Sequence, residues 1–367
     1  MPKRVLVGVL NWGLGHASRS IPVILALQKK GIEPLLAGDG QALSLLKHNF
    51  PQLAHVELPS YGIRYGRSGQ LITALMRQLP SILKAIRREQ VLIQKLVKEQ
   101  GIQGIISDNR YGLYHDQVPT AFICHQLSVI PPWGEQLLRK QLYNYHLSWI
   151  NRFDYCWIPD FPGEHNLSGT LSHLYPLPPA ARFAGPLSHF HQLPSKDPAS
   201  QLPEGFHAEL VAVLSGPEPQ RSMLEAIIRK QAEHIDQSVL LVKGKPGDQY
   251  RFQPLERVNV VPYLLGADLR RVLAAASIVI SRSGYSSLMD YATLGLKRVG
   301  LIPTPGQSEQ LYLAQNAEEL RIAPFMQQKH LVIKELIKRT QEYNGFVATP
   351  PGGYLNQVIE EFISRIN

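Results

Sequence analysis

Hydroxyl-bearing residues are concentrated at 281–290, where a buried strand is predicted to end. This stretch reads "SRSGYSSLMD" and follows the apolar run "ASIVI". The pattern predicts a strand, a tight turn at Gly284 and a helix that begins among Ser283, Ser286 and Ser287. Backbone N–H groups and hydroxyls at a helix N-terminus bind anions, so these residues could hold a diphosphate without a metal ion.

The acid that closes this stretch, Asp290, is placed to contact the sugar ring of a nucleotide. It lies four residues after Ser286, on the same helix face and about 6 Å along the helix axis. Roughly that distance separates a diphosphate from the ribose beyond it, and a carboxylate accepts hydrogen bonds from two vicinal hydroxyls. We therefore predict that Asp290 binds ribose. Alternatively, the serines cap the helix and Asp290 only complements its dipole.

A second group of candidates lies near the N-terminus, in "LNWGLGHASRS", residues 10–20. Gly13 and Gly15 permit a tight turn between a strand and a helix, and close approach of a ligand to the backbone. They do not form the dinucleotide-binding fingerprint, because a third glycine is missing. His16 follows them, and its unperturbed pKa near 6.5 suits a general base. The alternative is a histidine that caps the helix or fills the core.

Two further strand ends in the first half carry polar side chains. Asp108 and Asn109 close the run "IISDN", and His125 closes "FICH". If the ends of the first strand and of the Asp108 strand are neighbours, Asp108 could orient the imidazole of His16. We assign Asn109 and His125 to the side of the site that faces an acceptor.

The remaining candidates follow strands of the second half. A Gly/Pro turn at 214–222 could line phosphates, the end of the strand at 258–264 could contact a base, and 303–316 offers amides to a polyhydroxylated ligand. The residues assigned to these contacts are Ser215, Gly216, Tyr263, Leu264, Gln307 and Gln310.

Strands and helices must alternate in both halves of the chain to position these residues. This alternation predicts an α/β protein with two Rossmann-like domains, whose strand carboxyl ends face a central cleft. The apolar runs are "RVLVGVL", "EPLLAG", "HVELP", "GIISD", "TAFICH", "YCWIPDF" and "RFAGPL", then "ELVAVLSG", "SVLLVKG", "VNVVPYL", "SIVISRSG" and "RVGLIP". The expected parts are a first domain at 1–186, a linker at 187–204, a second domain at 205–345, and a C-terminal helix at 346–367 that packs on the first domain.

Composition and charge restrict the class of protein. Lys and Arg outnumber Asp and Glu by 38 to 29, but no nucleic-acid-binding signature is present, so nucleic acid is not an expected partner. No apolar run reaches the length of a membrane span, and we interpret the N-terminus as a strand, not a signal peptide. The stretch 76–100 predicts a basic amphipathic helix, with either a solvated face or one that touches anionic lipid.

Metal ions and disulfides are not expected. The chain has two cysteines, Cys124 and Cys156, and no Asp-x-Asp motif or His/Cys cluster. These features fit a reducing cytoplasm, and no cofactor is expected apart from a nucleotide substrate.

Together these motifs resemble the glycosyltransferases of the GT-B fold, and most closely the MurG-type branch of family 28. "SRSGYSSLMDYATLGLKRVGLIP" is similar to that branch's donor motif, "GLGHASR" to its glycine-rich acceptor-side loop, and "ICHQ" to its "LHEQ" segment. The resemblance implies a UDP-sugar donor. It also implies that Asp290 binds ribose, that Gln310 contacts the donor sugar, and that Tyr263 and Leu264 contact uracil. Within the donor motif, it implies that residues 285–289, which include Tyr285, Ser286 and Ser287, line the nucleotide, and Arg282, Ser283 and Gly284 belong to the same donor-binding motif.

Several positions depart from the family pattern. The first loop lacks the fuller Gly-Gly-Thr-Gly-Gly sequence, and 214–218 replaces the "GGSQG" loop. Lys297 stands in place of a proline, and Ser188 in place of an arginine. "GLGHASR" also resembles the "GFGHxxR" loop of GT-B-like nucleotide-sugar hydrolases, in which the histidine assists water.

Three functions follow as expectations. The first is an inverting, metal-independent glycosyltransferase, with His16 as base and Asp108 as its orienting acid. It would transfer a sugar, such as an N-acetylhexosamine, from a UDP-sugar to a lipid-linked, envelope or small-molecule acceptor, in the cytoplasm or at the inner face of the membrane. The second is a nucleotide-sugar hydrolase, and the third is a catalytically silent nucleotide-sugar-binding protein.

Overall fold

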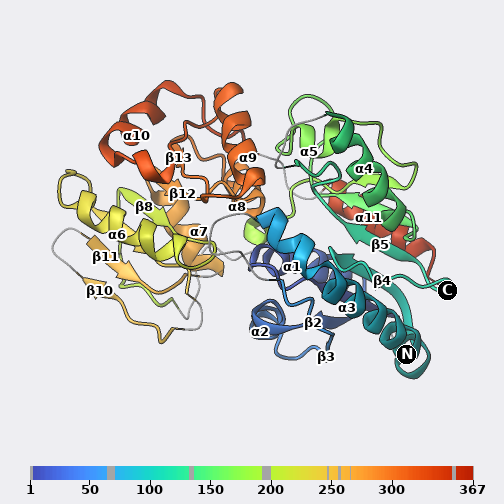
Figure 1. Ribbon diagram of the computed structural model, residues 1–367. Helices are drawn as coiled ribbons and strands as arrows, with labels where there is room; N and C mark the ends of the chain where they lie inside the picture. The colour runs from blue at the N-terminus through green and yellow to red at the C-terminus, as the bar shows by residue number, and fades with distance from the viewer. Residues whose placement is uncertain are drawn as a thin grey trace. The chain divides into compact units, whose positions relative to one another are not determined.

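The chain divides into two compact units, each built around its own sheet (Figure 1). The first unit comprises Met1–Ser188 with Pro350–Asn367, and the second comprises His189–Thr349. The predicted α/β class, with one Rossmann-like domain in each half, is confirmed. The computed structural model describes residues 3–63, 71–131, 136–191, 200–245, 248–254, 258–264, 266–348 and 353–366. Residues 192–199 of the predicted linker therefore lie outside the described part.

The first sheet has the strand order β3-β2-β1-β4-β5-β6-β7 among the described residues, and its neighbouring strands are parallel. Its strands are β1 (Arg4–Val9), β2 (Glu33–Gly38), β3 (His55–Glu57), β4 (Ile102–Asp108), β5 (Thr120–Ile123), β6 (Tyr155–Ile158) and β7 (Ala181–Phe183). The helices of this unit are α1 (Gly15–Lys29), α2 (Gly40–Asn49), α3 (Leu71–Gln100), α4 (Gln136–Ile150), α5 (Thr170–His173) and α11 (Gly353–Ser364).

Helices cover both faces of this sheet. Consecutive side chains of a strand point to opposite faces, so a buried strand packs against both helical layers. On β6, Cys156 belongs to a buried cluster that includes Tyr143 of α4. The next residue, Trp157, instead packs its ring edge to face with Phe362 of α11, with ring centroids 5.7 Å apart. Burial on both faces explains why the strands read as continuous apolar runs in the sequence.

The C-terminal helix α11 lies in the first unit (Figure 1). It contacts α1 and β7 there. Phe362 is fully buried. A Cβ atom placed on Gly104 of β4 would lie 3.0 Å from the Phe362 ring, so this helix approaches the sheet closely where glycine leaves room. Arg182 and Glu361 form an ion pair at 2.9 Å between β7 and α11.

The second sheet has the order β10-β11-β9-β8-β12-β13 among the described residues and is parallel except for β10. Its strands are β8 (Leu210–Val213), β9 (Val239–Val242), β10 (Gln253–Pro254), β11 (Val258–Val261), β12 (Ile278–Ser281) and β13 (Val299–Leu301). Its helices are α6 (Gln220–Ala232), α7 (Gly266–Ala275), α8 (Tyr285–Leu294), α9 (Ser308–Glu319) and α10 (Ile333–Arg339), with short 3₁₀ turns η1 (His189–His191), η2 (Gln328–His330) and η3 (Thr340–Glu342).

The basic stretch predicted as a helix is the C-terminal part of α3. Ile93 and Leu96 are buried against the first sheet, whereas the lysines and arginines face outward. Of the charged residues of this helix, Glu89 is fully buried, and it pairs with Arg110. Within the described residues, no helix is both long and apolar enough to cross a membrane.

Candidate functional site

In the first unit, the candidate site forms where β1 and β4 end side by side. These strands are neighbours in the sheet, and Val9 pairs with Asp108 in their register. The chain leaves β1 through Gly13, whose φ of +83° favours glycine, and α1 begins at Gly15. His16 therefore lies in the first turn of α1, with Nδ1 2.7 Å from Oδ1 of Asp108. The sequence alone did not show that these two strand ends adjoin.

Asp108 is an ionised carboxylate in an almost closed environment, with 1% of its side chain exposed. Burial alone would raise its pKa, but the positive charge of Arg19 and the contact with His16 outweigh that effect and lower the pKa to about 2. Arg19 donates from Nε to Oδ2 at 2.5 Å and from Nη2 to Oδ1. The hydroxyl of Ser20 lies 3.5 Å from Oδ2. Asp108 thus remains a hydrogen-bond acceptor throughout the physiological pH range.

His16 remains neutral at physiological pH. Burial is the main cause that lowers its pKa, and the charge of Arg19 adds to it, although Asp108 opposes both. Because Asp108 is ionised, the 2.7 Å contact requires a hydrogen on Nδ1, which leaves the lone pair on Nε2. A neutral imidazole with a lone pair on Nε2, steadied by a carboxylate at Nδ1, has the arrangement of a general base.

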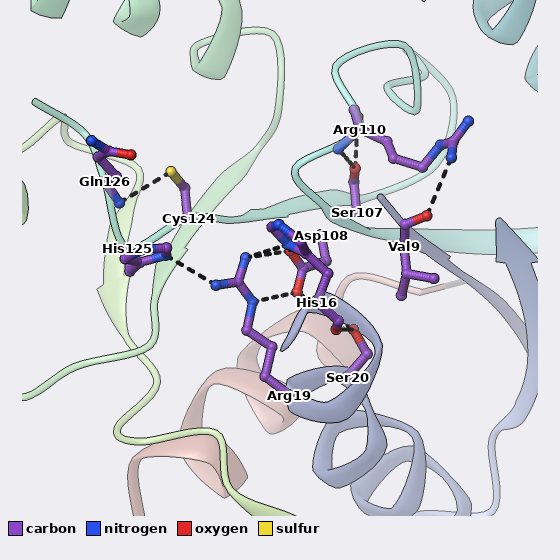
Figure 2. Close-up of polar contacts among 10 residues, drawn as sticks. All are labelled: Val9, His16, Arg19, Ser20, Ser107, Asp108, Arg110, Cys124, His125 and Gln126. Atoms are coloured by element: carbon purple, nitrogen blue, oxygen red, sulfur yellow. Dashed lines mark hydrogen bonds and ion pairs between the residues drawn. The ribbon is translucent and has the colours of Figure 1, made fainter. Parts of the chain in front are cut away.

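Arg19 is a central residue of this cluster, although no role was predicted for it from the sequence. It lies three residues after His16 on the same helix face, and 2% of its side chain is exposed. Figure 2 shows its guanidinium between Asp108 and His125, with Nη1 3.0 Å from Nδ1 of His125. The His-x-x-Arg spacing was the signal that could have identified it, because that spacing places both side chains over one turn.

The two acceptor-side candidates differ in their surroundings. His125 follows β5, which is the neighbour of β4 in the sheet, and it contacts the cluster through Arg19. Asn109 has a left-handed backbone, with φ of 57°, and turns the chain away after β4. Among the described residues, its side chain forms no hydrogen bond with His16, Arg19 or His125. Arg110 and Ser107 instead hold this turn through hydrogen bonds to each other (Figure 2).

In the second unit, the chain passes from β12 into α8 as the sequence predicted. Gly284 is the N-cap residue, in extended conformation, and no side chain of the described residues caps the helix. The alternative in which serines cap this helix is therefore wrong for Ser283, which is buried and donates its hydroxyl hydrogen to the carbonyl oxygen of Gln310 at 2.7 Å. Ser286, Ser287 and Asp290 are half-buried on α8.

Three loops of the second unit converge beside the start of α8, because β8, β12 and β13 are neighbours in the sheet. Gln310 links the loop after β13 to the turn before α8. Its Oε1 accepts from the Thr304 backbone N–H at 2.9 Å, and its backbone carbonyl oxygen accepts from Ser283. A Cβ atom on Gly216 would lie 3.3 Å from Oγ1 of Thr304, so the loop after β8 adjoins both. Ser215 and Gly216 are exposed there. The buried hydroxyl of Thr304 has no hydrogen-bond partner within the described residues. Thr304 was not among the residues predicted for the site.

Arg282 connects these loops through hydrogen bonds in the interior of the second unit. It is fully buried, and its guanidinium donates to the carbonyl oxygens of Ile302, Pro303 and Gln220 and to Oε1 of Gln328. Burial lowers its pKa to about 10, so it stays charged at neutral pH. Its side chain ties the β12–α8 turn to neighbouring loops, which favours a positioning role over the direct donor contact implied by the resemblance. Tyr285 is also buried.

The remaining candidates lie at the carboxyl ends of β11 and β13. Leu264 is buried, whereas Tyr263 is half-buried and packs edge to face with Tyr250 at 5.8 Å. Gln307 is the N-cap residue of α9. A cavity of about 390 Å³ opens beside the ends of β9 and β11, and Lys243, Asp248, Gln249, Tyr250, Arg251, Gln253, Val260 and Pro262 line it.

No group of three or more His, Cys, Asp or Glu side chains within the described residues is arranged to hold a metal ion. The acid–base cluster of the first unit combines one carboxylate with one arginine and two histidines. The arginine occupies both oxygens of that carboxylate. This geometry fits proton transfer better than metal coordination.

Residues 210–346 match the family model of the glycosyltransferase family 28 C-terminal domain. No curated protein matches the sequence. Among solved structures, the fold is similar to that of the glycosyltransferase SnogD from Streptomyces nogalater, with 14% identity and a TM-score of 0.61 over 100% of this chain and 95% of that chain.

Two other solved structures share the fold across nearly the whole chain. MurG from Acinetobacter baumannii is 13% identical, with a TM-score of 0.56 over 99% of this chain and 100% of that chain. A putative UDP-N-acetylglucosamine 2-epimerase from Listeria monocytogenes is 14% identical, with a TM-score of 0.60 over 98% of this chain and 95% of that chain. At these identities the likeness shows the fold, which is the predicted GT-B fold.

Proposed function

Because residues 210–346 match the family model of the glycosyltransferase family 28 C-terminal domain and the chain has the GT-B fold, we propose that the protein transfers a sugar from a UDP-sugar to an acceptor hydroxyl. One site from each unit takes part in the proposed reaction. The anomeric carbon is inverted by direct displacement, and neither a metal ion nor a further cofactor takes part.

The hydrogen bond between His16 and Asp108 is the observation that carries this proposal. It leaves Nε2 of His16 as the proton acceptor, and the lowered pKa keeps that atom unprotonated at neutral pH. In the proposed step, Nε2 takes the proton of the acceptor hydroxyl. The oxygen then forms a bond to the anomeric carbon while the bond from that carbon to the diphosphate breaks, and UDP leaves. Asp108 stabilises the imidazolium that forms.

The donor is held by the start of α8 in this proposal. The N-terminal backbone N–H groups of α8, with Ser286 and Ser287, would bind the diphosphate and stabilise its leaving charge. Asp290, one turn further along the helix, would accept hydrogen bonds from the ribose hydroxyls. The uracil would lie at Tyr263 and Leu264.

The two glutamines would contact the sugar itself. Gln310 is well supported for this role, because its carbonyl and amide oxygens are already fixed by Ser283 and Thr304. Within the described residues, its amide nitrogen has no hydrogen-bond partner and can turn toward a ligand, and that nitrogen lies 4.0 Å from a Cβ atom placed on Gly284. Gln307, at the start of α9, offers a second amide.

UDP release tests the proposal directly. The protein is incubated with a series of UDP-sugars, with and without candidate acceptors, and free UDP is measured. Rapid release that depends on one sugar and one acceptor supports the transferase. Release at equal rates with and without every acceptor would instead identify a hydrolase.

The acceptor is proposed to be lipid-linked, which would bring the protein to an anionic membrane surface on the cytoplasmic side. The support is the outward face of α3, whose exposed cations are Arg77, Lys84, Arg87, Arg88, Lys95 and Lys98. Basic helices bind anionic lipid headgroups electrostatically. Cosedimentation with vesicles of phosphatidylglycerol but not of phosphatidylcholine, abolished by high salt, is expected. Equal behaviour with both lipids would favour a soluble acceptor.

A nucleotide-sugar hydrolase is the second candidate, and the position of Arg19 favours it. This arginine completes the "GLGHASR" loop that resembles the hydrolase pattern, and it contacts the same carboxylate as His16. In that reaction Nε2 of His16 would take the proton from water. A silent binding protein is the third candidate. A protein without a reaction to catalyse would not need His16 to be paired with Asp108.

A further inference from the structure

The guanidinium of Arg19 dictates where His125 carries its hydrogen. A guanidinium has five N–H donors and no acceptor. Because Nη1 of Arg19 lies 3.0 Å from Nδ1 of His125, Nδ1 must supply the lone pair. A neutral imidazole carries one hydrogen, so that hydrogen lies on Nε2 of His125.

His16 carries its hydrogen on the opposite nitrogen. Its Nδ1 lies 2.7 Å from Oδ1 of Asp108 and 2.9 Å from Nη2 of Arg19. Nη2 also donates to the same Oδ1, so both groups converge on one carboxylate oxygen (Figure 2). If Nδ1 instead accepted a hydrogen from Arg19, two acceptors would face each other at 2.7 Å, which is repulsive.

A doubly protonated His125 fits this geometry poorly. It would set a second N–H, and a second positive charge, against Arg19 inside a site where His125 is 8% exposed. The single carboxylate among the described contacts of Arg19 is Asp108, and both of its oxygens already accept from Arg19. In the neutral form with hydrogen on Nε2, Nδ1 of His125 accepts a hydrogen bond from Arg19.

We propose that Arg19 is a positioning residue that fixes His16 and His125 in opposite tautomers, so that Nε2 of His16 is an acceptor and Nε2 of His125 is a donor. The tautomers follow from the contacts of the first unit alone. Their use rests on the proposed function: His16 accepts the proton of the attacking hydroxyl, and His125 enters any substrate contact as an N–H donor to oxygen. Arg19 acts on both through one rigid planar group, a geometry that lysine cannot reproduce.

Nitrogen NMR of the histidine rings tests the tautomers without any substrate. Long-range ¹H–¹⁵N spectra of protein labelled at histidine distinguish a protonated ring nitrogen from an unprotonated one. The chain has 13 histidines, so His16→Gln and His125→Gln variants assign the two rings by loss of their signals. The expected result at neutral pH is hydrogen on Nδ1 of His16 and on Nε2 of His125. Hydrogen on Nδ1 of His125 would overturn the proposal.

Two substitutions of Arg19 then test its role. Arg19→Lys keeps the charge, and Arg19→Met keeps the bulk without a donor. In both, the His125 signals are expected to shift toward a mixture of tautomers. Unchanged His125 signals in a folded Arg19→Met or Arg19→Lys protein would overturn the proposal, and the lysine variant remains informative if the methionine variant does not fold. Arg139→Met is the matched control, because Arg139 also donates to several partners in the first unit, at Ser128 and Thr170.

Activity supplies an independent readout. Arg19→Lys is expected to lower kcat on the order of 10²-fold, the effect of misplacing a reacting group, with UDP affinity unchanged. A change in UDP affinity without a change in kcat would contradict the positioning role. If the NMR result holds but no UDP-sugar is turned over, the proposed function fails and the tautomer assignment stands. If turnover is found and the tautomers are not opposite, only the role of Arg19 fails.

Discussion

Ser283 donates its hydroxyl hydrogen to the backbone carbonyl of Gln310, 2.7 Å away, and so links two stretches that the sequence presents as separate motifs. The first stretch starts α8 and the second belongs to α9. Since Ser283 is fully buried, this contact fixes the turn before α8 and does not offer a hydroxyl to a ligand. The diphosphate contacts proposed for α8 therefore come from its backbone and from Ser286 and Ser287.

Substitution of Asp290 tests the ribose contact. Asp290→Ala is expected to weaken UDP binding by about 1–3 kcal/mol, the range for hydroxyls that lose a charged partner. Calorimetric titration with UDP measures the change. Asp290→Asn, which keeps the shape and one acceptor oxygen, is the matched control and should lose less. Unchanged affinity in a folded Asp290→Ala protein would remove this assignment.

Substitution of His16 separates the two enzymatic candidates. His16→Ala is expected to lower turnover by roughly 10²–10⁴-fold with UDP affinity almost intact, because the base acts in the chemical step. A transferase should release UDP slowly from donor alone, since its site excludes water until an acceptor is bound. Fast acceptor-free release that disappears in His16→Ala would favour the hydrolase. No effect in either assay would leave the silent binding protein.

Chelation tests the role given to α8. If the backbone N–H groups at its start stabilise the leaving diphosphate, activity should persist in excess EDTA. The measurement is the initial rate of UDP formation before and after dialysis against chelator. Loss of activity that Mg²⁺ or Mn²⁺ restores would show that a cation supplies this stabilisation instead.

Acid should destabilise the second unit through His189. This side chain is 7% exposed, and burial lowers its pKa to about 4. The unfolded state, with a pKa near 6.5, binds the proton first as the pH falls, so stability is complete above pH 6.5 and declines toward pH 4. The expected loss is about 3 kcal/mol. Urea unfolding from pH 7.5 to 4.5 measures it. His189→Gln should flatten the profile, whereas His55→Gln, at an exposed position, should leave it unchanged.

The packing of α11 should be essential to the first unit. Phe362→Ala removes a fully buried ring that contacts Tyr155, Trp157 and Gly104, and the expected loss is about 3–5 kcal/mol of unfolding free energy. Chemical denaturation followed by tryptophan fluorescence reports it. Val347→Ala, at a side chain that is 79% exposed, is the control. A loss below 1 kcal/mol for Phe362→Ala would show that α11 contributes little to this unit.

Most strands were predictable because they are buried on both faces of a sheet and therefore read as continuous apolar runs bounded by turns. The edge strand β10, whose residues Gln253 and Pro254 are exposed, was not predicted. The start of α8 was predictable for a similar local reason: its glycine, its serines and the preceding strand are contiguous in sequence. By contrast, the contact of His16 with Asp108 depends on β1 and β4 being neighbours, which is a property of strand order.

Buried polar residues were the least predictable part of the site. Arg19 and Arg282 are charged, and charged residues in a sequence usually indicate an exposed face. Both are buried here because acceptors meet each guanidinium: the Asp108 carboxylate for Arg19, and several carbonyl oxygens for Arg282. Those acceptors come from distant parts of the chain, so no local sequence pattern predicts the contacts. Thr304 was missed for the same reason, since its environment is made by Gly216 and Gln310.

The return of α11 to the first unit has a consequence for how the protein is made. Domains often fold during synthesis, the N-terminal one first. Here the sheet that is translated first lacks its cover over Gly104 and Trp157 until residues 353–364 have left the ribosome. The second unit is complete in sequence before that moment. The N-terminal half of the chain is therefore expected to reach its final packing last, with an apolar surface that a chaperone would shield in the meantime.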